Sequence, residues 1–138
     1  MGMFFISSYG IAQEHNHGDE NSKITQSIIE IMRNMNKNMH KLTNAIIIED
    51  YPTITLSAHD IANHPGIDTQ DLHHLFERLG PRKEDFILCD NAVHNLAIDI
   101  SKAGEQENID LVLEKYSAMI AKIVQCHREY KPKTGNKE

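Results

Sequence analysis

The chain has 138 residues, with fourteen Lys and Arg against twenty Asp and Glu and a formal net charge of −6. This length fits one domain, and a hydrophobic share of 40% is enough to build an apolar core. The acidic balance argues against nucleic acid and anionic membrane as partners, and no apolar run reaches the roughly 18 residues that span a bilayer.

The first residues differ in character from the rest of the chain. An apolar stretch at residues 3–6 precedes the small-residue sequence Gly10-Ile11-Ala12, which is typical of the end of a secretory signal. Residues 1–12 are therefore predicted to be a signal-peptide remnant, with a disordered tail as the alternative. Residues 13–22 are polar and are predicted to be a flexible lead-in that carries histidines and acidic residues. An export signal would place the protein in the periplasm, an oxidising compartment.

The next part of the chain has helical periodicity. Apolar residues recur every three or four positions from residue 24 to residue 46, which predicts a long amphipathic helix. The sequence at residues 49–52 ends it, and Pro52 suits the first turn of a second helix. That second helix presents Ile54, Ala58 and Ile61. It ends at the helix-breaking sequence of residues 63–66.

Three more helices are predicted in the second half. A short one runs from Thr69 to Leu79 and ends at a Gly-Pro pair. A long one closes at Gly104 and shows an apolar face made of Phe86, Cys89, Val93, Leu96 and Ile100. The last begins after Asn108 and carries a stripe of Ile109, Val112, Tyr116, Ile120, Ile123 and His127. No strand alternation is visible anywhere in the chain.

Four main amphipathic helices joined by short connections favour one architecture. The prediction is an all-α, antiparallel four-helix bundle over residues 23–133, followed by a tail at residues 134–138.

A Cys-His pair near the end of the last helix is the most informative chemical feature. Haem of the c type attaches through Cys-x-x-Cys-His, in which two thiols bond the haem vinyl groups and His binds iron. Cys126 and His127 match the end of that motif, but Ile123 stands where the first Cys belongs. By itself the pair fits either a haem site or a buried thiol beside a helix-end His.

Other stretches give this pair a context. They are residues 32–42, Ala45-Ile46 before Glu49-Asp50-Tyr51, residues 61–65, Phe86 with Asp90, His94 and Ala97, and residues 126–131. In this order and spacing, the chain from about residue 24 to residue 133 resembles the cytochrome c-prime family of exported four-helix-bundle haem proteins. It is most similar to relatives that lack a conventional distal ligand.

The resemblance implies roles for several residues. Cys126 would form a thioether to haem c, and His127 would be the proximal iron ligand. Lys131 would place a cation close to that imidazole, and Phe86 would pack on the macrocycle. The implied function is electron transfer or binding of a small gas, with a redox partner or gas left unnamed, in a chain that could pair as a homodimer.

The open side of the iron would face the first helix. Ile29 would lie opposite the iron, and Met32 would lie one turn further along the same wall. Because an Ile side chain cannot ligate, the resemblance implies a five-coordinate iron that admits a small gas and excludes larger ligands.

Two departures from the family pattern keep a second hypothesis open. At most one thioether can form, because Ile123 replaces the first thiol, and Thr25 stands where the family tends to have an Arg near the haem propionates. The alternative is a haem-free bundle of the same family in which Ile123 fills the space, acting as a periplasmic metal-binding or structural protein.

In that alternative the metal ligands are expected in the N-terminal tail. His15 and His17 lie among acidic residues, and imidazole with carboxylate suits copper, nickel or zinc. Processing after Ala12 would make His15 the third residue, which can complete a square-planar Cu(II) or Ni(II) site with the terminal amine. The other histidines are expected to be dispersed or at the surface rather than ligands: His40, His59, His64, His73, His74 and His94.

The two cysteines could pair with each other. If the Cα atoms of Cys89 and Cys126 lie within about 4.4–6.8 Å, an oxidising compartment would favour a disulfide that consumes the haem thiol. The sequence leaves this pairing open. No enzyme is predicted, because the phosphate-binding glycine loop, the His-Glu-x-x-His helix and the Gly-x-Ser-x-Gly elbow are all missing from the sequence.

Overall fold

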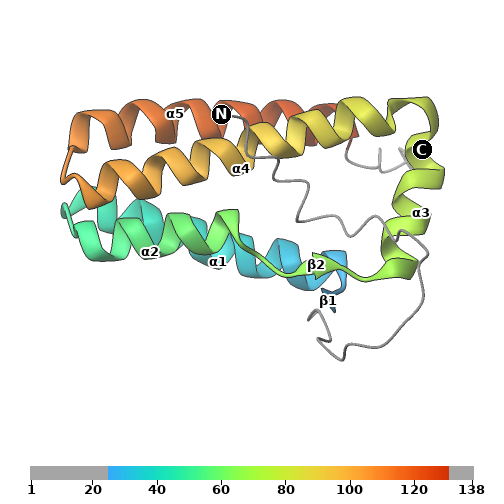
Figure 1. Cartoon of the computed structure of the whole chain (residues 1–138), viewed down its shortest axis with the longest axis horizontal. Coiled ribbons are helices and arrows are strands. Elements are labelled where there is room, and N and C mark those ends of the chain that lie inside the picture. The colour runs from blue at the N-terminus through green and yellow to red at the C-terminus, as the bar shows by residue number, and fades with distance from the viewer. Residues whose placement is uncertain (1–24, 131–138) are drawn as a thin grey trace, which may run out of the picture.

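The structure, a computed structural model, describes residues 25–130. Its four main helices are α1 (Ile28–Ile47), α2 (Tyr51–Ala62), α4 (Lys83–Glu105) and α5 (Ile109–Tyr130). They form the antiparallel bundle in Figure 1, which confirms the predicted all-α four-helix architecture. The short helix α3 (Thr69–Leu79) runs across one end of the bundle, and the 3-10 turn η1 (Gly80–Arg82) connects it to α4.

Local signals explain where the first two helices begin. Ser27 caps α1: its hydroxyl accepts from the backbone N–H of Glu30 at 3.3 Å, and the Glu30 carboxylate accepts from the backbone N–H of Ser27 at 3.3 Å. Asp50 caps α2 by accepting from the N–H of Thr53 at 3.2 Å, and Pro52 occupies the first turn as predicted.

Two short strands lie outside the predicted pattern. β1 (Thr25–Gln26) pairs in parallel with β2 (Gly66–Ile67), with Thr25 opposite Gly66. The sequence shows no strand alternation here, because two residues are too short to produce an alternating pattern. The pairing brings the segment after α2 alongside the start of α1.

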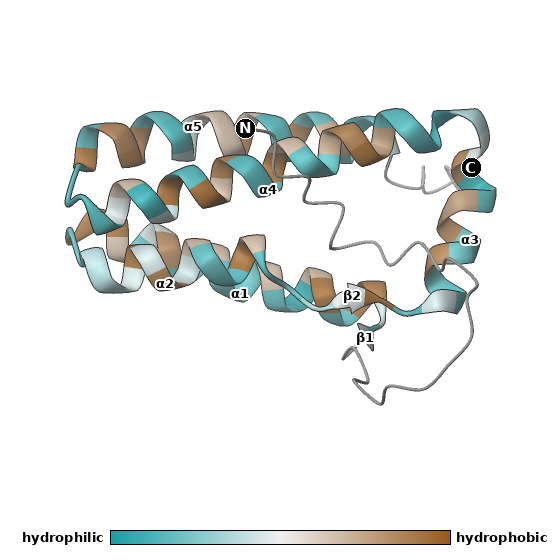
Figure 2. Ribbon diagram, in the orientation of Figure 1, coloured by the Kyte–Doolittle hydropathy of each residue, from teal (hydrophilic) through white to brown (hydrophobic). Residues whose placement is uncertain are grey.

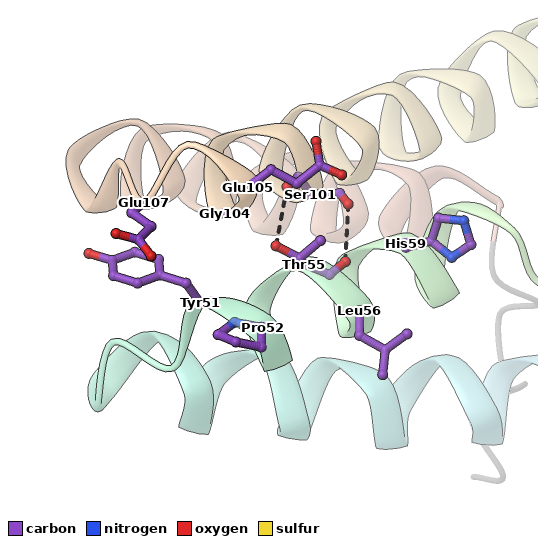
Figure 3. A pocket seen from close by; sticks show the side chains of 9 residues that line it. All are labelled: Tyr51, Pro52, Thr55, Leu56, His59, Ser101, Gly104, Glu105 and Glu107. Carbon is purple, nitrogen blue, oxygen red and sulfur yellow. Dashed lines mark hydrogen bonds between the residues drawn. The ribbon is translucent and has the colours of Figure 1, made fainter.

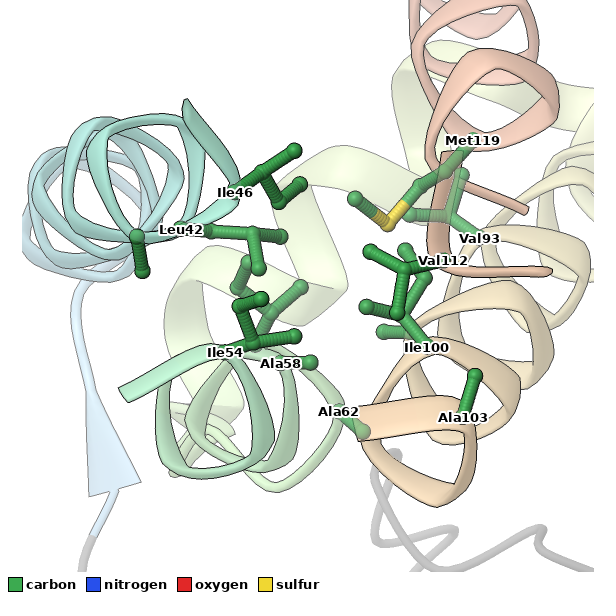
Figure 4. Packing of buried hydrophobic residues seen from close by; sticks show 13 residues of the cluster. Leu42, Ile46, Ile54, Ala58, Ala62, Val93, Ile100, Ala103, Val112 and Met119 are labelled. Carbon is green, nitrogen blue, oxygen red and sulfur yellow. The ribbon is translucent and has the colours of Figure 1, made fainter. Parts of the chain in front are cut away.

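The main core lies between the four long helices. Figure 4 shows its side chains meeting along the bundle axis, and Figure 2 shows the polar faces of the helices turned outward. The core is made of Leu42, Ala45, Ile46, Ile54, Ala58, Ile61, Ala62, Val93, Ala97, Ile100, Ala103, Val112 and Met119. Gly104 lets α4 approach α2 closely, since a Cβ there would lie 2.6 Å from Oγ1 of Thr55. On the side where α1 faces α5, the hydroxyls of Thr43 and Tyr116 form a 2.6 Å hydrogen bond.

A second, smaller cluster closes the end of the bundle that α3 covers. Its buried members are Leu75, Leu79, Cys89 and Tyr130. Two arginines join this end to the last turn of α5: Arg78 donates to the carbonyl oxygen of Tyr130 at 3.2 Å, and Arg82 donates to that of Glu129 at 3.0 Å. These bonds satisfy helix-end carbonyls that would otherwise lack partners. Among residues 25–130, no helix combines the length and apolarity needed to cross a membrane.

Candidate functional site

The covalent link between α4 and α5 lies in the second cluster. Cys89 on α4 and Cys126 on α5 form a disulfide, with their Cα atoms 6.1 Å apart. This distance is within the range expected for a bridge, so the pairing that the sequence left open is present. Cys89 is 8% exposed, and Cys126 packs against both hydrophobic clusters. The bridge therefore forms part of the packing at this end.

Two histidines from distant parts of the chain meet beside this end of the bundle. His64 lies in the connection between α2 and β2, and His94 lies in the middle of α4. Their Nε2 atoms are 2.8 Å apart, and their ring centroids are 4.9 Å apart with the planes inclined at 41°. His94 is 7% exposed, whereas His64 is half-buried. This pair, together with Asp90, is called the histidine site below.

The remaining ring nitrogens of the histidine site face acceptors. Nδ1 of His64 lies 2.7 Å from the carbonyl oxygen of Pro65, and a carbonyl can only accept, so this nitrogen carries a hydrogen. Nδ1 of His94 lies 3.2 Å from Oδ2 of Asp90, one turn earlier on α4. That contact is close without being an aligned hydrogen bond, and Oδ2 of Asp90 is otherwise a buried oxygen with no partner. The carboxylate nevertheless favours the hydrogen of His94 on Nδ1.

Burial disfavours the charged form of the His94 ring. Burial lowers the pKa of His94 below its ordinary value, His64 lowers it further, and Asp90 acts in the opposite direction. A neutral ring with its hydrogen on Nδ1 leaves a lone pair on Nε2. Nε2 of His64 lies 2.8 Å from Nε2 of His94, which is the length of a hydrogen bond between the two rings. The two Nε2 atoms therefore face each other, and a larger separation would let both bind a common cation.

The prediction that the bundle histidines are dispersed or superficial was wrong for this pair. The reason is the β1–β2 pairing and the loop that leads to it, which turn His64 back toward α4. The remaining four are exposed, as expected: His40, His59, His73 and His74. Sequence reasoning named Asp90 and His94 only as part of the family resemblance. It did not use their spacing, which places a carboxylate one helical turn from an imidazole.

Of the residues assigned to haem, Phe86 and Cys126 pack against the same second cluster, whereas the others among the described residues are not gathered there. Ile29 and Met32 are on the outer side of α1, 63% and 47% exposed. Phe86 packs edge-to-face on Tyr130 in the second cluster, with ring centroids 5.5 Å apart. Ile123 is half-buried beside the main core.

The two residues that match the haem motif have different surroundings. Cys126 is bonded to Cys89, and the neighbouring His127 is exposed to solvent. While the disulfide is intact, these residues do not fit a thioether-linked haem, because no free thiol is available at the motif. Haem binding stays a prediction. Lys131, His15 and His17 lie outside the described residues.

A separate open cleft of about 490 Å³ lies between α2 and α4 at the opposite end of the bundle (Figure 3). It is lined by Tyr51, Pro52, Thr55, Leu56, His59, Ser101, Gly104, Glu105 and Glu107. Thr55 and Ser101 cross-link its floor, since the Ser101 hydroxyl donates to the Thr55 carbonyl at 3.0 Å. Burial, with help from nearby acidic residues, raises the pKa of Tyr51. None of the residues predicted for haem lies here.

Within residues 25–130, no group of three or more His, Cys, Asp and Glu side chains is arranged to hold a metal ion. The histidine site thus offers two nitrogen ligands and an orienting carboxylate. Searches of family models, curated proteins and solved structures found no match to this chain.

Proposed function

We propose that this protein is a haem-free four-helix bundle that binds a transition-metal ion in an oxidising compartment such as the periplasm. The observation that carries the proposal is the pair of Nε2 atoms of His64 and His94, which face each other at 2.8 Å. Imidazole nitrogen is the commonest protein ligand for copper, nickel and zinc.

The surroundings of the two rings support the proposal. A histidine that binds a metal almost always donates its other ring N–H to a carboxylate or a backbone carbonyl, which fixes the tautomer and the ring orientation. His64 has the Pro65 carbonyl in that position, and His94 has Asp90. Both rings therefore have, beside Nδ1, the kind of acceptor that orients a metal-binding histidine.

The disulfide supports the part of the proposal that describes a haem-free protein in an oxidising compartment. Disulfides persist in oxidising compartments and are rare in the cytosol. The bond between Cys89 and Cys126 also engages the sulfur that a haem thioether would need. Both points favour the haem-free alternative.

Metal binding is tested on the chelator-treated, disulfide-bonded full chain. Equilibrium dialysis against Cu, Zn and Ni ions, each tested separately, should give one bound ion for at least one of these metals, and the His94→Asn variant should lose it. His59→Asn is the matched control, because His59 is exposed and lies outside the histidine site, and it should retain the ion. A His15→Ala/His17→Ala variant separates any ion bound by the tail. Equal binding by the His94 and His59 variants would refute the proposal.

Haem is tested separately. The protein is produced in a host that carries cytochrome-maturation genes, and its visible spectrum and intact mass are measured. We expect no Soret band and a mass that matches the disulfide-bonded chain. A haem adduct on Cys126 would overturn the haem-free assignment, and the cytochrome c-prime resemblance would then describe the function.

A further inference from the structure

The occupant of the histidine site follows from its ligand number, its charge and its geometry. We infer that His64 and His94 hold a single Cu(I) ion between their Nε2 atoms in near-linear, two-coordinate fashion. This inference rests on the proposed function, because it specifies which metal ion the same site selects.

The number of ligands is the first argument. Zinc in proteins is almost always four-coordinate in structural sites and keeps at least three protein ligands in catalytic ones. Within residues 25–130 no third His, Cys, Asp or Glu joins the pair. Cu(I) has a filled d shell and is stable with two nitrogen ligands opposite each other. The two ligands present match that ion.

Charge is the second argument. His94 is buried, and burying an uncompensated charge is costly. The charged group that faces its ring is the Asp90 carboxylate, with one negative charge. A monovalent ion between two neutral imidazoles balances that charge, whereas a divalent ion would leave an excess positive charge in a largely buried place. The site therefore favours Cu(I) over Zn(II) and Cu(II).

The geometry shows how the ion would enter. With metal–nitrogen bonds of about 2 Å, a linear site needs Nε2 atoms about 4 Å apart. The present separation is 2.8 Å, so one ring must withdraw by about 1 Å. His94 is fixed on α4 beside Asp90, while His64 lies in the connection between α2 and β2. His64 is thus the ligand that moves.

Sulfur atoms also bind a soft ion such as Cu(I). Substitutions in this chain can distinguish binding by sulfur from binding by the two histidines. Both cysteines are in the disulfide, so no thiolate is present. Met32, Met35 and Met39 lie on one side of α1 at helical spacing and offer thioethers. Their replacement by Leu keeps side-chain volume nearly constant and makes a matched control for the histidine variants.

The experiment uses Ag(I), a monovalent ion of the same geometry that needs no reductant and so leaves the disulfide intact. Native mass spectrometry of the full chain should show one Ag(I) per molecule. In ¹⁵N spectra the Nε2 signals of His64 and His94 should shift together while the other seven of the nine histidines keep theirs. His64→Asn and His94→Asn should each weaken binding at least 100-fold, and His59→Asn and the triple Met→Leu variant should leave it unchanged. His64→Asn decides the result if His94→Asn fails to fold.

Three results would overturn the inference, and they are distinguishable. Binding of Zn(II) or Cu(II) by the histidine site with no Ag(I) bound overturns the choice of ion and leaves the proposed function standing. Loss of Ag(I) in the Met→Leu variant and its retention in the histidine variants places the ion on α1. Absence of any bound ion overturns the inference and the proposed function together, and the pair is then an ordinary hydrogen bond between imidazoles.

Discussion

Removal of the disulfide should strongly destabilise the bundle. The perturbation is the double variant Cys89→Ala/Cys126→Ala, in which Ala is chosen over Ser because Cys89 is buried and a hydroxyl there would lack a partner. The bridge closes a segment with a sequence separation of 37. In the chain-entropy model, removing a cross-link that closes a loop of that length lowers the free energy of unfolding by about 4 kcal/mol.

This magnitude is large beside the total stability of a small domain, which is about 5–15 kcal/mol. It corresponds to a fall in melting temperature of about 15 °C for a domain of this size. The assay is urea unfolding followed by circular dichroism, performed on oxidised wild type, reduced wild type and the double variant. Reduced wild type and the variant should agree closely, since both lack the cross-link and differ mainly in two sulfur atoms.

The urea dependence provides an independent check on the reasoning. A cross-linked unfolded chain exposes less surface, so the m-value should rise when the bridge is absent. If the free energy of unfolding falls by less than about 1 kcal/mol, or the m-value stays constant, the bridge does not restrict the unfolded chain as argued here.

Three substitutions test the packing and capping of the bundle, each by urea unfolding. Gly104→Ala should cost about 1–2 kcal/mol although Ala favours helix, because its Cβ would lie 2.6 Å from Oγ1 of Thr55, and adding Thr55→Ala should recover part of the loss. Tyr116→Phe should cost about 1 kcal/mol through loss of the 2.6 Å bond to Thr43, and no measurable cost would show that solvent replaces that bond. Asp50→Ala should cost about 1 kcal/mol by removing the cap of α2, whereas Asp50→Asn should retain most of the stability.

The parts of the fold that depend on local signals could be predicted from the sequence. The bounds of α3, Thr69–Leu79, were predicted without error, because an apolar periodic stretch stops at Gly80-Pro81. Pro52 correctly marked the first turn of α2. The first helix was predicted to begin near residue 24, whereas the Ser27–Glu30 capping box starts it at Ile28. That box is itself a local signal, overlooked because the apolar spacing continues through it.

Features that depend on distant contacts could not be predicted. The pairing of β1 with β2 involves segments about forty residues apart and only two residues each. The same turn of chain carries His64 toward His94, thirty positions away. Periodicity reports which face of a helix is apolar and does not report which loop passes over it. The sequence shows the Asp90 carboxylate one helical turn before His94, but it does not show that His64 faces the His94 ring.

The two chemical features of the protein begin at adjacent residues of α4. Cys89 and Asp90 are neighbours in sequence, and successive helical side chains point about 100° apart. Cys89 therefore faces α5 and the second cluster, where it forms the disulfide, while Asp90 faces the same side as His94. Because the disulfide fixes α4 against α5, it also holds the helix on which the carboxylate and the imidazole are aligned. Sequence reasoning placed the ligand chemistry at Cys126, and it placed Asp90 and His94 only within a family resemblance, with His94 apart from the other histidines. The structure gives Cys126 a role in stability and brings His94 into the one pairing of facing ring nitrogens within residues 25–130.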